Sequence, residues 1–429
     1  MRSFILVAAM AATASAQTLT ATERAVARAV DTRNAEALAL LERVVNINSG
    51  TNNVAGVRAV GEIFVRELQA LGFNARLVQG TPDRGPHLVA EHPGSGPKML
   101  LIGHLDTVFE PSSPFQKFER LNDSTARGPG IIDMKGGDVI IVQALKALKD
   151  VGQLDKMNIV VVMTGDEEAS GRPLSLSKKA LIDAAQGAAY ALGFEDGPGD
   201  PRYAVISRRS SSGWRLTTTG TTGHSSQIFG EQMGFGAIYE AARIVNGFRE
   251  ALSKEQYLTF NPGMAVGGTA TTVDSTATAG TASGKTNVIA PSMTVTGDIR
   301  AISPEQLARA QATMRRIVSE NLPKTSATIS FDEGYPPMAP TDGNRRLLAQ
   351  YDAISKGLGL PPVDAVDPSR AGAADVAFVA SIVPMLMDGI GLMGRDDHSD
   401  KETADLRTLP TQTKKAAILI SRLGTGVRP

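Results

Sequence analysis

The sequence predicts an α/β protein with a mostly parallel sheet flanked by helices, into which a separate α+β unit is inserted. Two short apolar runs, residues 98–102 (KMLLI) and 157–163 (MNIVVVM), have the length and composition of buried strands. Residues 139–148 between them have the spacing of a helix. A strand, a helix and a second strand in this order indicate a parallel pair, and polar motifs follow both runs, where open α/β sheets bind their ligands.

Composition narrows the possible functions. The 429 residues, 42% of them hydrophobic, are enough for two or three domains with large cores. Forty-four basic and 44 acidic side chains cancel, so no net charge favours nucleic acid or an anionic membrane as a partner. The chain has no cysteine, which excludes disulfides, thiol nucleophiles and thiolate ligands. A metal ion would therefore depend on His, Asp and Glu.

The N-terminus predicts export. Arg2 precedes an apolar run over residues 4–10, and Ala14-Ser15-Ala16 has the small-x-small pattern of a cleavage site. A membrane anchor would need about 20 apolar residues, roughly twice the length of this run. We therefore expect residues 1–16 to be a signal peptide cleaved after Ala16, and the mature protein to be periplasmic or secreted, with no membrane segment.

The remaining elements divide the chain into two units. Helical spacing over 20–46 and 54–71 precedes the first apolar run, and Gly72 ends the second of these helices. From residue 213 the pattern changes to alternation typical of half-buried strands, interrupted by two helical segments. In order, these segments are strand 213–220, helix 232–252, strand 287–300, helix 304–321 and strand 326–332. Residues 213–335 are thus predicted to form the inserted unit, and residues 17–212 and 336–429 one discontinuous domain. The stretch 267–284, rich in Thr, Ala, Gly and Ser, is expected to be a mobile hairpin connection.

His104 is the first candidate metal ligand among only five histidines. It follows the predicted strand 98–102 in the motif Gly103-His104-Leu105-Asp106. Residues two apart lie on the same side of an extended chain, so Asp106 can accept a hydrogen bond from an imidazole that binds metal. Taken alone, the pair fits a structural histidine equally well.

Four further motifs repeat this arrangement. A glycine-rich turn before the helix 139–148 contains Asp133, and Glu167-Glu168 follow the strand 157–163. Glu195 comes after the apolar run at 191–194, and His398 lies near the C-terminus. Adjacent glutamates at the end of a buried strand repel unless a cation compensates them. Nitrogen and oxygen ligands of this kind suit zinc, cobalt or manganese.

These five motifs, in this order, resemble the co-catalytic zinc metallopeptidase family that includes bacterial glutamate carboxypeptidase, aminoacylase and succinyl-diaminopimelate desuccinylase. The resemblance covers nearly all of the mature chain and implies a zinc exopeptidase-like fold in which the inserted unit is a lid and dimerisation domain. It implies two Zn²⁺ ions, with Co²⁺ or Mn²⁺ as alternatives. His104 and Glu195 would hold one ion, Glu168 and His398 the other, and Asp133 would bridge them. Glu167 would be the general base and Asp106 the residue that orients His104, and the peptide bond after Asp133 would be cis.

The resemblance also implies substrate contacts. His224, in the turn 221–226, matches a lid histidine that reaches the neighbouring subunit's site in dimeric relatives, although a surface histidine in a turn is the alternative. Arg300 matches an arginine that binds the substrate carboxylate, and Asn287 matches a neighbouring polar contact. In the turn 369–375, Gly372 and Asp375 fit a glycine-rich turn near the metal site. Arg370 beside them is either a second positive group for the substrate or a solvent-facing side chain.

We therefore expect an exported di-metal hydrolase that cleaves peptide-like amide bonds next to a free carboxylate, of the glutamate carboxypeptidase type, and a homodimer formed through the lid. The substrate would be a small peptide or an N-acyl amino acid. An N-acyl-amino-acid hydrolase or a dipeptidase would use the same site, and these remain alternatives. A catalytically silent protein that holds metal and binds peptides is the alternative outside enzymes.

Overall fold

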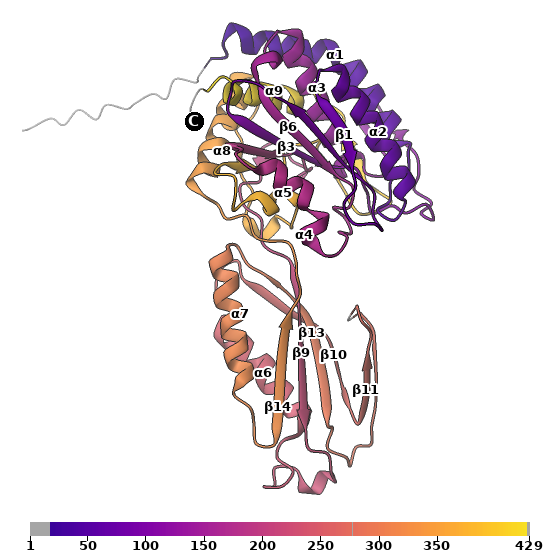
Figure 1. Cartoon of the computed structure of the whole chain (residues 1–429), viewed down its shortest axis with the longest axis vertical. Coiled ribbons are helices and arrows are strands. Elements are labelled where there is room, and N and C mark those ends of the chain that lie inside the picture. The colour runs from indigo at the N-terminus through magenta and orange to yellow at the C-terminus, as the bar shows by residue number, and fades with distance from the viewer. Residues whose placement is uncertain (1–17, 277, 427–429) are drawn as a thin grey trace, which may run out of the picture.

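The chain folds into two units, one above the other in Figure 1. The computed structural model describes residues 18–276 and 278–426, and the expected signal peptide, residues 1–16, lies outside these ranges. The first unit contains the N- and C-terminal segments together, and the second contains the middle of the chain. Among the described residues, no helix is long and apolar enough to cross a membrane.

The first unit is built on a six-stranded, mainly parallel sheet, as the sequence predicted. Its strand order is β1 (Asn74–Val78), β2 (His87–His92), β6 (Asn158–Thr164), β3 (Lys98–His104), β7 (Tyr190–Gly193) and β16 (Leu386–Met387). The strands β6, β3, β7 and β16 are parallel to one another. The edge pair β1 and β2 runs antiparallel, both within the pair and where β2 meets β6. The sequence analysis did not assign these two strands.

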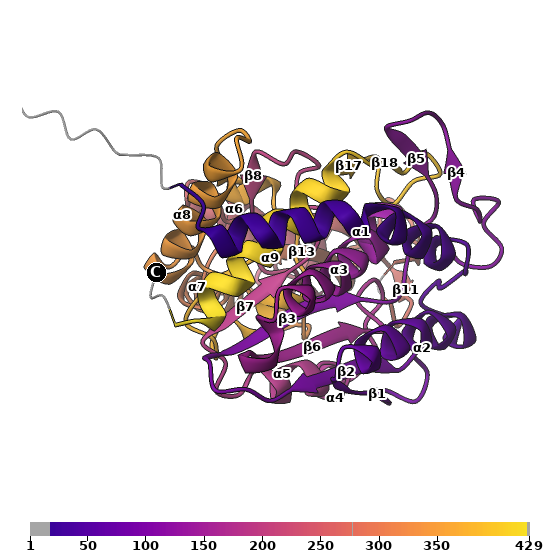
Figure 2. The same cartoon turned by 90° about the horizontal axis from the view of Figure 1, so that it is seen from above.

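Both faces of this sheet are covered, which explains why its strands are continuous apolar runs. On β3, Met99 and Leu101 join the larger core beneath the helices, whereas Leu100 and Ile102 face the other side, and all four are buried. The helices on the first face are α1 (Ala21–Val45), α2 (Val54–Ala70), α3 (Gly136–Asp150), α8 (Asp342–Gly357) and α9 (Thr408–Gly424). In Figure 2, α1, α3 and α9 lie across the sheet, and α1 packs on α3 and α9. The opposite face packs against α5 (Lys179–Ala185) and the segment 371–386.

Local signals account for where the helices begin. Thr20 and Glu23 form a capping box at the start of α1, in which each side chain accepts a hydrogen bond from the other residue's backbone N–H. Asn53 caps α2 and Thr341 caps α8, each through one side-chain oxygen that accepts a backbone N–H of the first turn. The start of the N-terminal helix is therefore determined by its own sequence. An ion pair between Glu23 of α1 and Arg422 of α9, at 2.6 Å, connects this helix to the C-terminal one.

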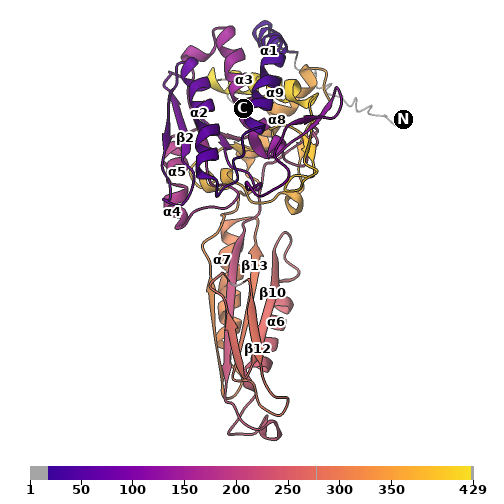
Figure 3. The ribbon, with the colours of Figure 1, turned by 90° about the vertical axis from the view of Figure 1, so that its right-hand side faces the viewer.

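The second unit has its own antiparallel sheet and core. The sheet order is β10 (Thr259–Gly268), β13 (Ser292–Arg300), β9 (Ser212–Gly220) and β14 (Thr325–Phe331). Two helices, α6 (Gly236–Leu252) and α7 (Pro304–Ser319), cover one face, and the long narrow slab they form is clear in Figure 3. Alternate residues of β14 are exposed, so the other face meets solvent, as the period-two pattern predicted. Residues 267–284 include a short hairpin of β11 (Ala270–Val273) and β12 (Gly280–Ser283).

Two antiparallel segments join the units. Ser211 bridges Tyr335 and Arg208 bridges Met338, so the chain leaves and re-enters the first unit side by side. The predicted limits of the second unit, 213 and 335, differ by a few residues from the ends of its outermost strands. Short elements complete the first unit: β4 (Glu119–Arg120), β5 (Thr125–Arg127), α4 (Leu174–Ser177), β8 (Tyr203–Ala204), β15 (Asp364–Ala365), β17 (Gly394–Arg395) and β18 (Thr403–Asp405).

Candidate dinuclear metal site

The candidate ligands meet at the carboxyl edge of the parallel strands. His104 is the last residue of β3, and Glu195 lies two residues beyond the end of β7. Glu167 and Glu168 lie three and four residues beyond the end of β6. Parallel strands end at the same edge of a sheet, so residues that lie far apart in the sequence come together there.

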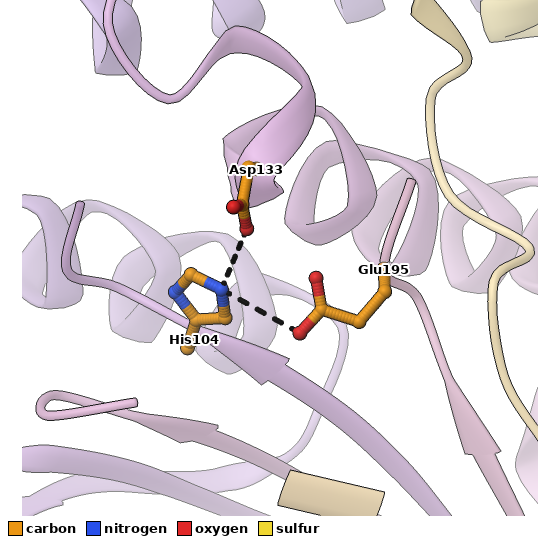
Figure 4. A group of neighbouring side chains, drawn as sticks. All are labelled: His104, Asp133 and Glu195. Carbon is orange, nitrogen blue, oxygen red and sulfur yellow. Dashed lines mark hydrogen bonds and ion pairs between the residues drawn. The ribbon is translucent and has the colours of Figure 1, made fainter. Parts of the chain in front are cut away.

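The first group of ligands is drawn in Figure 4. The Nε2 atom of His104 lies 3.1 Å from Oδ1 of Asp133 and 3.6 Å from Oε1 of Glu195. His104 itself is buried, with 1% of its side chain exposed. These three residues offer ligand atoms close enough to hold one cation between them.

The second group shares Asp133. The Nε2 atom of His398 lies 2.9 Å from Oδ2 of Asp133 and 3.2 Å from Oε2 of Glu168. The two oxygens of Asp133 therefore face different imidazoles, which is the arrangement a bridging carboxylate needs. The sequence analysis missed Asp397, whose carboxylate also lies near Asp133 and His398. Its place directly before His398 could have identified it.

Asp106 organises the residues around His104. The Nδ1 atom of His104 lies 3.1 Å from the backbone carbonyl oxygen of Asp106 and 3.5 Å from its Oδ1 atom. The two carboxylate oxygens of Asp106 accept the backbone N–H groups of Glu167 at 3.0 Å and Glu168 at 3.1 Å. The hydroxyl of Thr51 donates a third hydrogen bond at 2.6 Å. The buried Asp106 thus holds both the first imidazole and the turn that carries the two glutamates.

The turn that carries Asp133 is held by Glu402, which the sequence analysis did not single out. The Glu402 carboxylate accepts hydrogen bonds from the backbone N–H groups of Gly130 at 2.8 Å, Ile132 at 2.9 Å and Asp133 at 3.2 Å. Glu402 is fully buried. The peptide bond between Asp133 and Met134 is cis, as the resemblance implied.

A buried lysine lies behind the turn of Glu167. The ammonium group of Lys178 is 2.9 Å from the carboxylate of Asp375 and 3.2 Å from that of Asp166, and all three side chains are almost completely buried. The hydroxyl of Tyr335 donates to the backbone carbonyl of Glu167 at 2.8 Å. Tyr335 and Lys178 were not among the predicted site residues, because their partners lie far away in the sequence.

The electrostatics of the cluster fit a requirement for cations. Burial raises the pKa of Glu167 and Glu195 well above the usual range, and burial together with Asp133 raises the pKa of Glu168 to about 7. Hydrogen bonds with Asp133 and Glu168 raise the pKa of His398 to about 11. The Oε1 atom of Glu168 is buried with no hydrogen-bond partner among the described residues. Bound cations would replace the protons that these crowded groups otherwise hold.

The cluster opens into a cavity of about 240 Å³. Its wall includes four of the five predicted ligands, Asp133, Glu168, Glu195 and His398, with Glu167 beside them. Gly372 and Arg370 lie on the same wall, so the predicted glycine-rich turn does border the site, and Arg370 is a lining residue.

The other predicted contacts lie elsewhere in this single chain. The strand β9 starts beside the first unit at Ser212 and runs nine residues, about 30 Å, away from it. His224 follows its outer end and pairs with Val288, and the N–H of Ser225 donates to the carbonyl of Asn287 at 2.9 Å. His224 and Asn287 are thus neighbours, but neither lines the cavity.

Arg300 lies at the opposite, inner end of the second unit. It is the last residue of β13, pairs with Thr259 across the sheet, and donates through Nε to Asp298 at 3.1 Å. It does not line the cavity either. The structure therefore brings together all five predicted ligands, Glu167, Asp106 and Gly372, while His224, Asn287 and Arg300 belong to the second unit outside the cavity.

Two imidazoles and two glutamates around a shared aspartate, beside a further buried glutamate in a cavity, define a metal-dependent hydrolase on an α/β fold. The chain belongs to peptidase family M20/M25/M40, whose family model matches residues 100–422. It is 30% identical over 393 residues to carboxypeptidase G2 of Pseudomonas sp. (strain RS-16), which covers 90% of this chain and 89% of that protein.

Solved structures share the fold. Aminopeptidase PepT from Bacillus cereus superposes with a TM-score of 0.71 at 17% identity, covering 91% of this chain and 98% of that one. The YXEP protein of Bacillus subtilis, described as a dinuclear metal-binding peptidase of the M20 family, has a TM-score of 0.63 at 14% identity and covers 92% of this chain and 99% of that one. The protein is thus a metal-dependent peptidase or amidohydrolase of this family.

Proposed function

We propose that the protein is an exported di-metal exopeptidase of the glutamate carboxypeptidase type, which cleaves a peptide-like amide bond next to a free carboxylate. The observation that carries this proposal is the position of Asp133, whose two carboxylate oxygens face His104 and His398 separately at 3.1 and 2.9 Å. The similarity to carboxypeptidase G2 over most of both chains supports the choice of substrate class.

The five ligands divide between two cations. His104 and Glu195 would hold one, Glu168 and His398 the other, and Asp133 both. We propose zinc, with cobalt or manganese as alternatives, because the ligands are imidazole nitrogens and carboxylate oxygens. Such a cation pair supplies Lewis acidity and lowers the pKa of water.

Glu167 is the proposed general base. Its carboxyl lines the cavity but is not among the five ligands, so it is available to accept a proton from the attacking water. The same carboxyl then returns that proton to the leaving nitrogen. Asp106 and Tyr335 hold its backbone by hydrogen bonds at 3.0 and 2.8 Å, which keeps the carboxyl oriented toward the cavity.

The second unit is proposed to act as a lid and as the dimer contact. His224 and Asn287 lie at its outer end, where they are available to a second copy's cavity, and Arg300 lies at its inner end, toward its own first unit. In this proposal His224 stabilises negative charge on the substrate carbonyl and Arg300 binds the carboxylate next to the scissile amide. Three apolar side chains near the outer end, Phe229, Ile238 and Tyr239, are 45–55% exposed, which supports a protein contact there.

Export rests on the N-terminal sequence. A short apolar run behind Arg2 and the triplet Ala14-Ser15-Ala16 support cleavage after Ala16 and a periplasmic or secreted location. The mass or the N-terminal sequence of the protein recovered outside the cytoplasm should identify Gln17 as the first residue. A chain that retained Met1 would contradict export by cleavage.

The experiment for the function combines metal removal with a substrate series. Protein treated with a chelator should lose hydrolysis of N-acyl amino acids, dipeptides and pteroyl-glutamate conjugates, and zinc, cobalt or manganese should restore it. Substrates whose C-terminal carboxylate is amidated are the matched controls and should be cleaved poorly. Best turnover on simple N-acyl amino acids or on free dipeptides would favour the aminoacylase or dipeptidase alternative. Metal binding without any hydrolysis would favour the silent peptide-binding protein.

A further inference from the structure

Arg370 is an exposed cationic side chain that lines the cavity and has no assigned role. It ends the short turn Pro368–Arg370 and lines the same cavity as Glu167 and His398. Within residues 18–276 and 278–426, its guanidinium group makes no hydrogen bond or ion pair. A free guanidinium beside a substrate cavity can bind an anion through two parallel hydrogen bonds.

The turn that carries Arg370 is fixed from both sides. The carboxylate of Asp367 accepts the backbone N–H of Ser369 at 2.8 Å, and Arg209 donates to the carbonyl of Ser369 at 3.2 Å. On the other side of Arg370, Arg208 donates to the carbonyl of Gly372 at 2.8 Å. The backbone is therefore held in place while the guanidinium stays available, which lowers the entropy lost when it binds a ligand.

Two other arginines near the cavity already have a buried partner or a proposed role, Arg208 as the partner of Asp388 and Arg300 as the ligand of the carboxylate next to the scissile amide. Arg208 also lines the cavity, but it is buried and its Nε donates to Asp388 at 2.8 Å. Arg300 is bonded to Asp298 and lies outside the cavity. Among the residues that the structure describes, Arg370 is thus the arginine lining the cavity whose guanidinium has no hydrogen-bond partner.

Two acidic residues interact electrostatically with Arg370, but neither forms an ion pair with its guanidinium group. Asp367 is occupied by the backbone and hydroxyl of Ser369, and Asp200 forms its ion pair with Arg202 at 2.6 Å. Gly372 also lines the cavity and has no atom within 4 Å of the position a Cβ would take, so the cavity wall is open at this glycine, two residues from Arg370. A substrate group has space to reach it.

We propose that Arg370 binds a second carboxylate of the substrate, in addition to the one next to the scissile amide. This inference rests on the proposed function and deepens it, because it makes the enzyme selective for a substrate with two acidic groups. The second carboxylate can belong to an acidic C-terminal residue or to a dicarboxylic acyl group, since both present the same anion to the same guanidinium.

Paired substrates that differ only in charge test the inference and separate the two sources. N-benzoyl-glutamate against N-benzoyl-glutamine places the charge on the leaving residue, and N-succinyl-alanine against N-succinamoyl-alanine places it on the acyl group. The wild type should prefer the charged member of one pair by on the order of ten-fold in kcat/KM, mainly through KM. Arg370→Ala should remove this preference by lowering kcat/KM for the charged member much more than for the uncharged one, and Arg370→Lys should keep part of it, because the charge remains but the fork is lost.

Arg316→Ala is the matched control, since Arg316 is an exposed arginine of α7 in the second unit that pairs with Glu320. It should leave the preference unchanged. Metal content and melting temperature of Arg370→Ala should equal those of the wild type. If Arg370→Ala leaves the charged-to-uncharged ratio unchanged in both pairs, or lowers both members equally, the inference is overturned while the proposed hydrolase stands. If the metal-loaded wild type cleaves none of the four compounds, the proposed function itself fails.

Discussion

The carboxylate of Asp106 accepts the backbone N–H of Glu167 at 3.0 Å through Oδ1, the oxygen that also faces the imidazole of His104 at 3.5 Å. One buried carboxylate therefore couples the orientation of a metal ligand to the position of the proposed base. Asp106→Asn should weaken metal binding by about 10- to 100-fold and lower kcat as well, because an amide donor cannot accept all of these hydrogen bonds. Equilibrium dialysis and steady-state kinetics measure the two effects. Asp155→Asn, at an exposed position, is the control and should change neither.

Glu167→Gln should retain both metal ions and lose most turnover. Glu167 is outside the ligand set, and an amide cannot accept the proton of the attacking water, so kcat should fall by on the order of 10³-fold or more. Elemental analysis checks the metal and single-turnover assays check the chemical step. Glu168→Gln is the contrasting variant and should lose metal. Full turnover by Glu167→Gln would remove Glu167 from the base role.

Lys178→Met should destabilise the first unit strongly. Removing the ammonium group leaves the carboxylates of Asp166 and Asp375 buried without their cation, at a cost of about 3–5 kcal/mol. The adjacent Lys179 is exposed and pairs with exposed Asp183, so Lys179→Met should change stability by less than about 0.5 kcal/mol. Thermal unfolding of the two variants side by side measures the difference. Equal melting temperatures would show that the buried pair contributes no more than the surface pair.

Buried Lys415 should make the free energy of unfolding depend on pH. Burial lowers the pKa of Lys415 to about 7, whereas the unfolded chain titrates at about 10.4. Between these values the unfolded state binds more protons, so this residue makes stability rise with pH from about 7 to 10.4, by at most about 1.4 kcal/mol per pH unit. Below pH 7 both states are protonated and the full cost of burying the charge remains.

Lys415→Met should therefore stabilise the protein more at pH 6 than at pH 9, relative to the wild type. The difference in melting temperature between variant and wild type at each pH isolates this residue from other titrating groups. Lys414 is the adjacent control, because it pairs with Asp31 at 2.6 Å and remains partly exposed. The stability difference for Lys414→Met should not change over this range. A pH-independent difference for Lys415→Met would contradict the lowered pKa.

The proposed role of His224 in the partner's cavity predicts that two inactive variants recover activity when their subunits are mixed. If His224 serves the partner's cavity, His224→Ala and Glu167→Gln are each nearly inactive, but a mixed dimer contains one intact site. A random one-to-one mixture of subunits should recover about one quarter of wild-type activity, since half of the dimers are mixed and each has one competent site of two. Activity assays after subunit exchange measure this recovery. No recovery, with mixed dimers present, would mean that His224 does not act across the interface.

Local patterns in the sequence were sufficient for much of the fold. The strands β3 and β6 are buried on both faces, so nearly all of their residues are apolar. Such an uninterrupted apolar run can be recognised in the sequence without knowing what it packs against. The alternation in β9, β13 and β14 was equally clear because one face of that sheet meets solvent. The strands β1 and β2 were missed because they have mixed burial and polar residues at the edge of the sheet.

The candidate metal ligands could likewise be found from the sequence, since each of His104, Asp133, Glu168, Glu195 and His398 follows a strand or turn signal that places it at one edge of the sheet. What only the tertiary structure decided is which groups support them. Glu402 reaches the Asp133 turn from 269 positions away, Lys178 joins Asp166 to Asp375, and Arg370 is left free while Arg208 is tied to Asp388. Pairing and desolvation depend on distance through space, so no spacing along the chain could have distinguished these residues from ordinary surface charges.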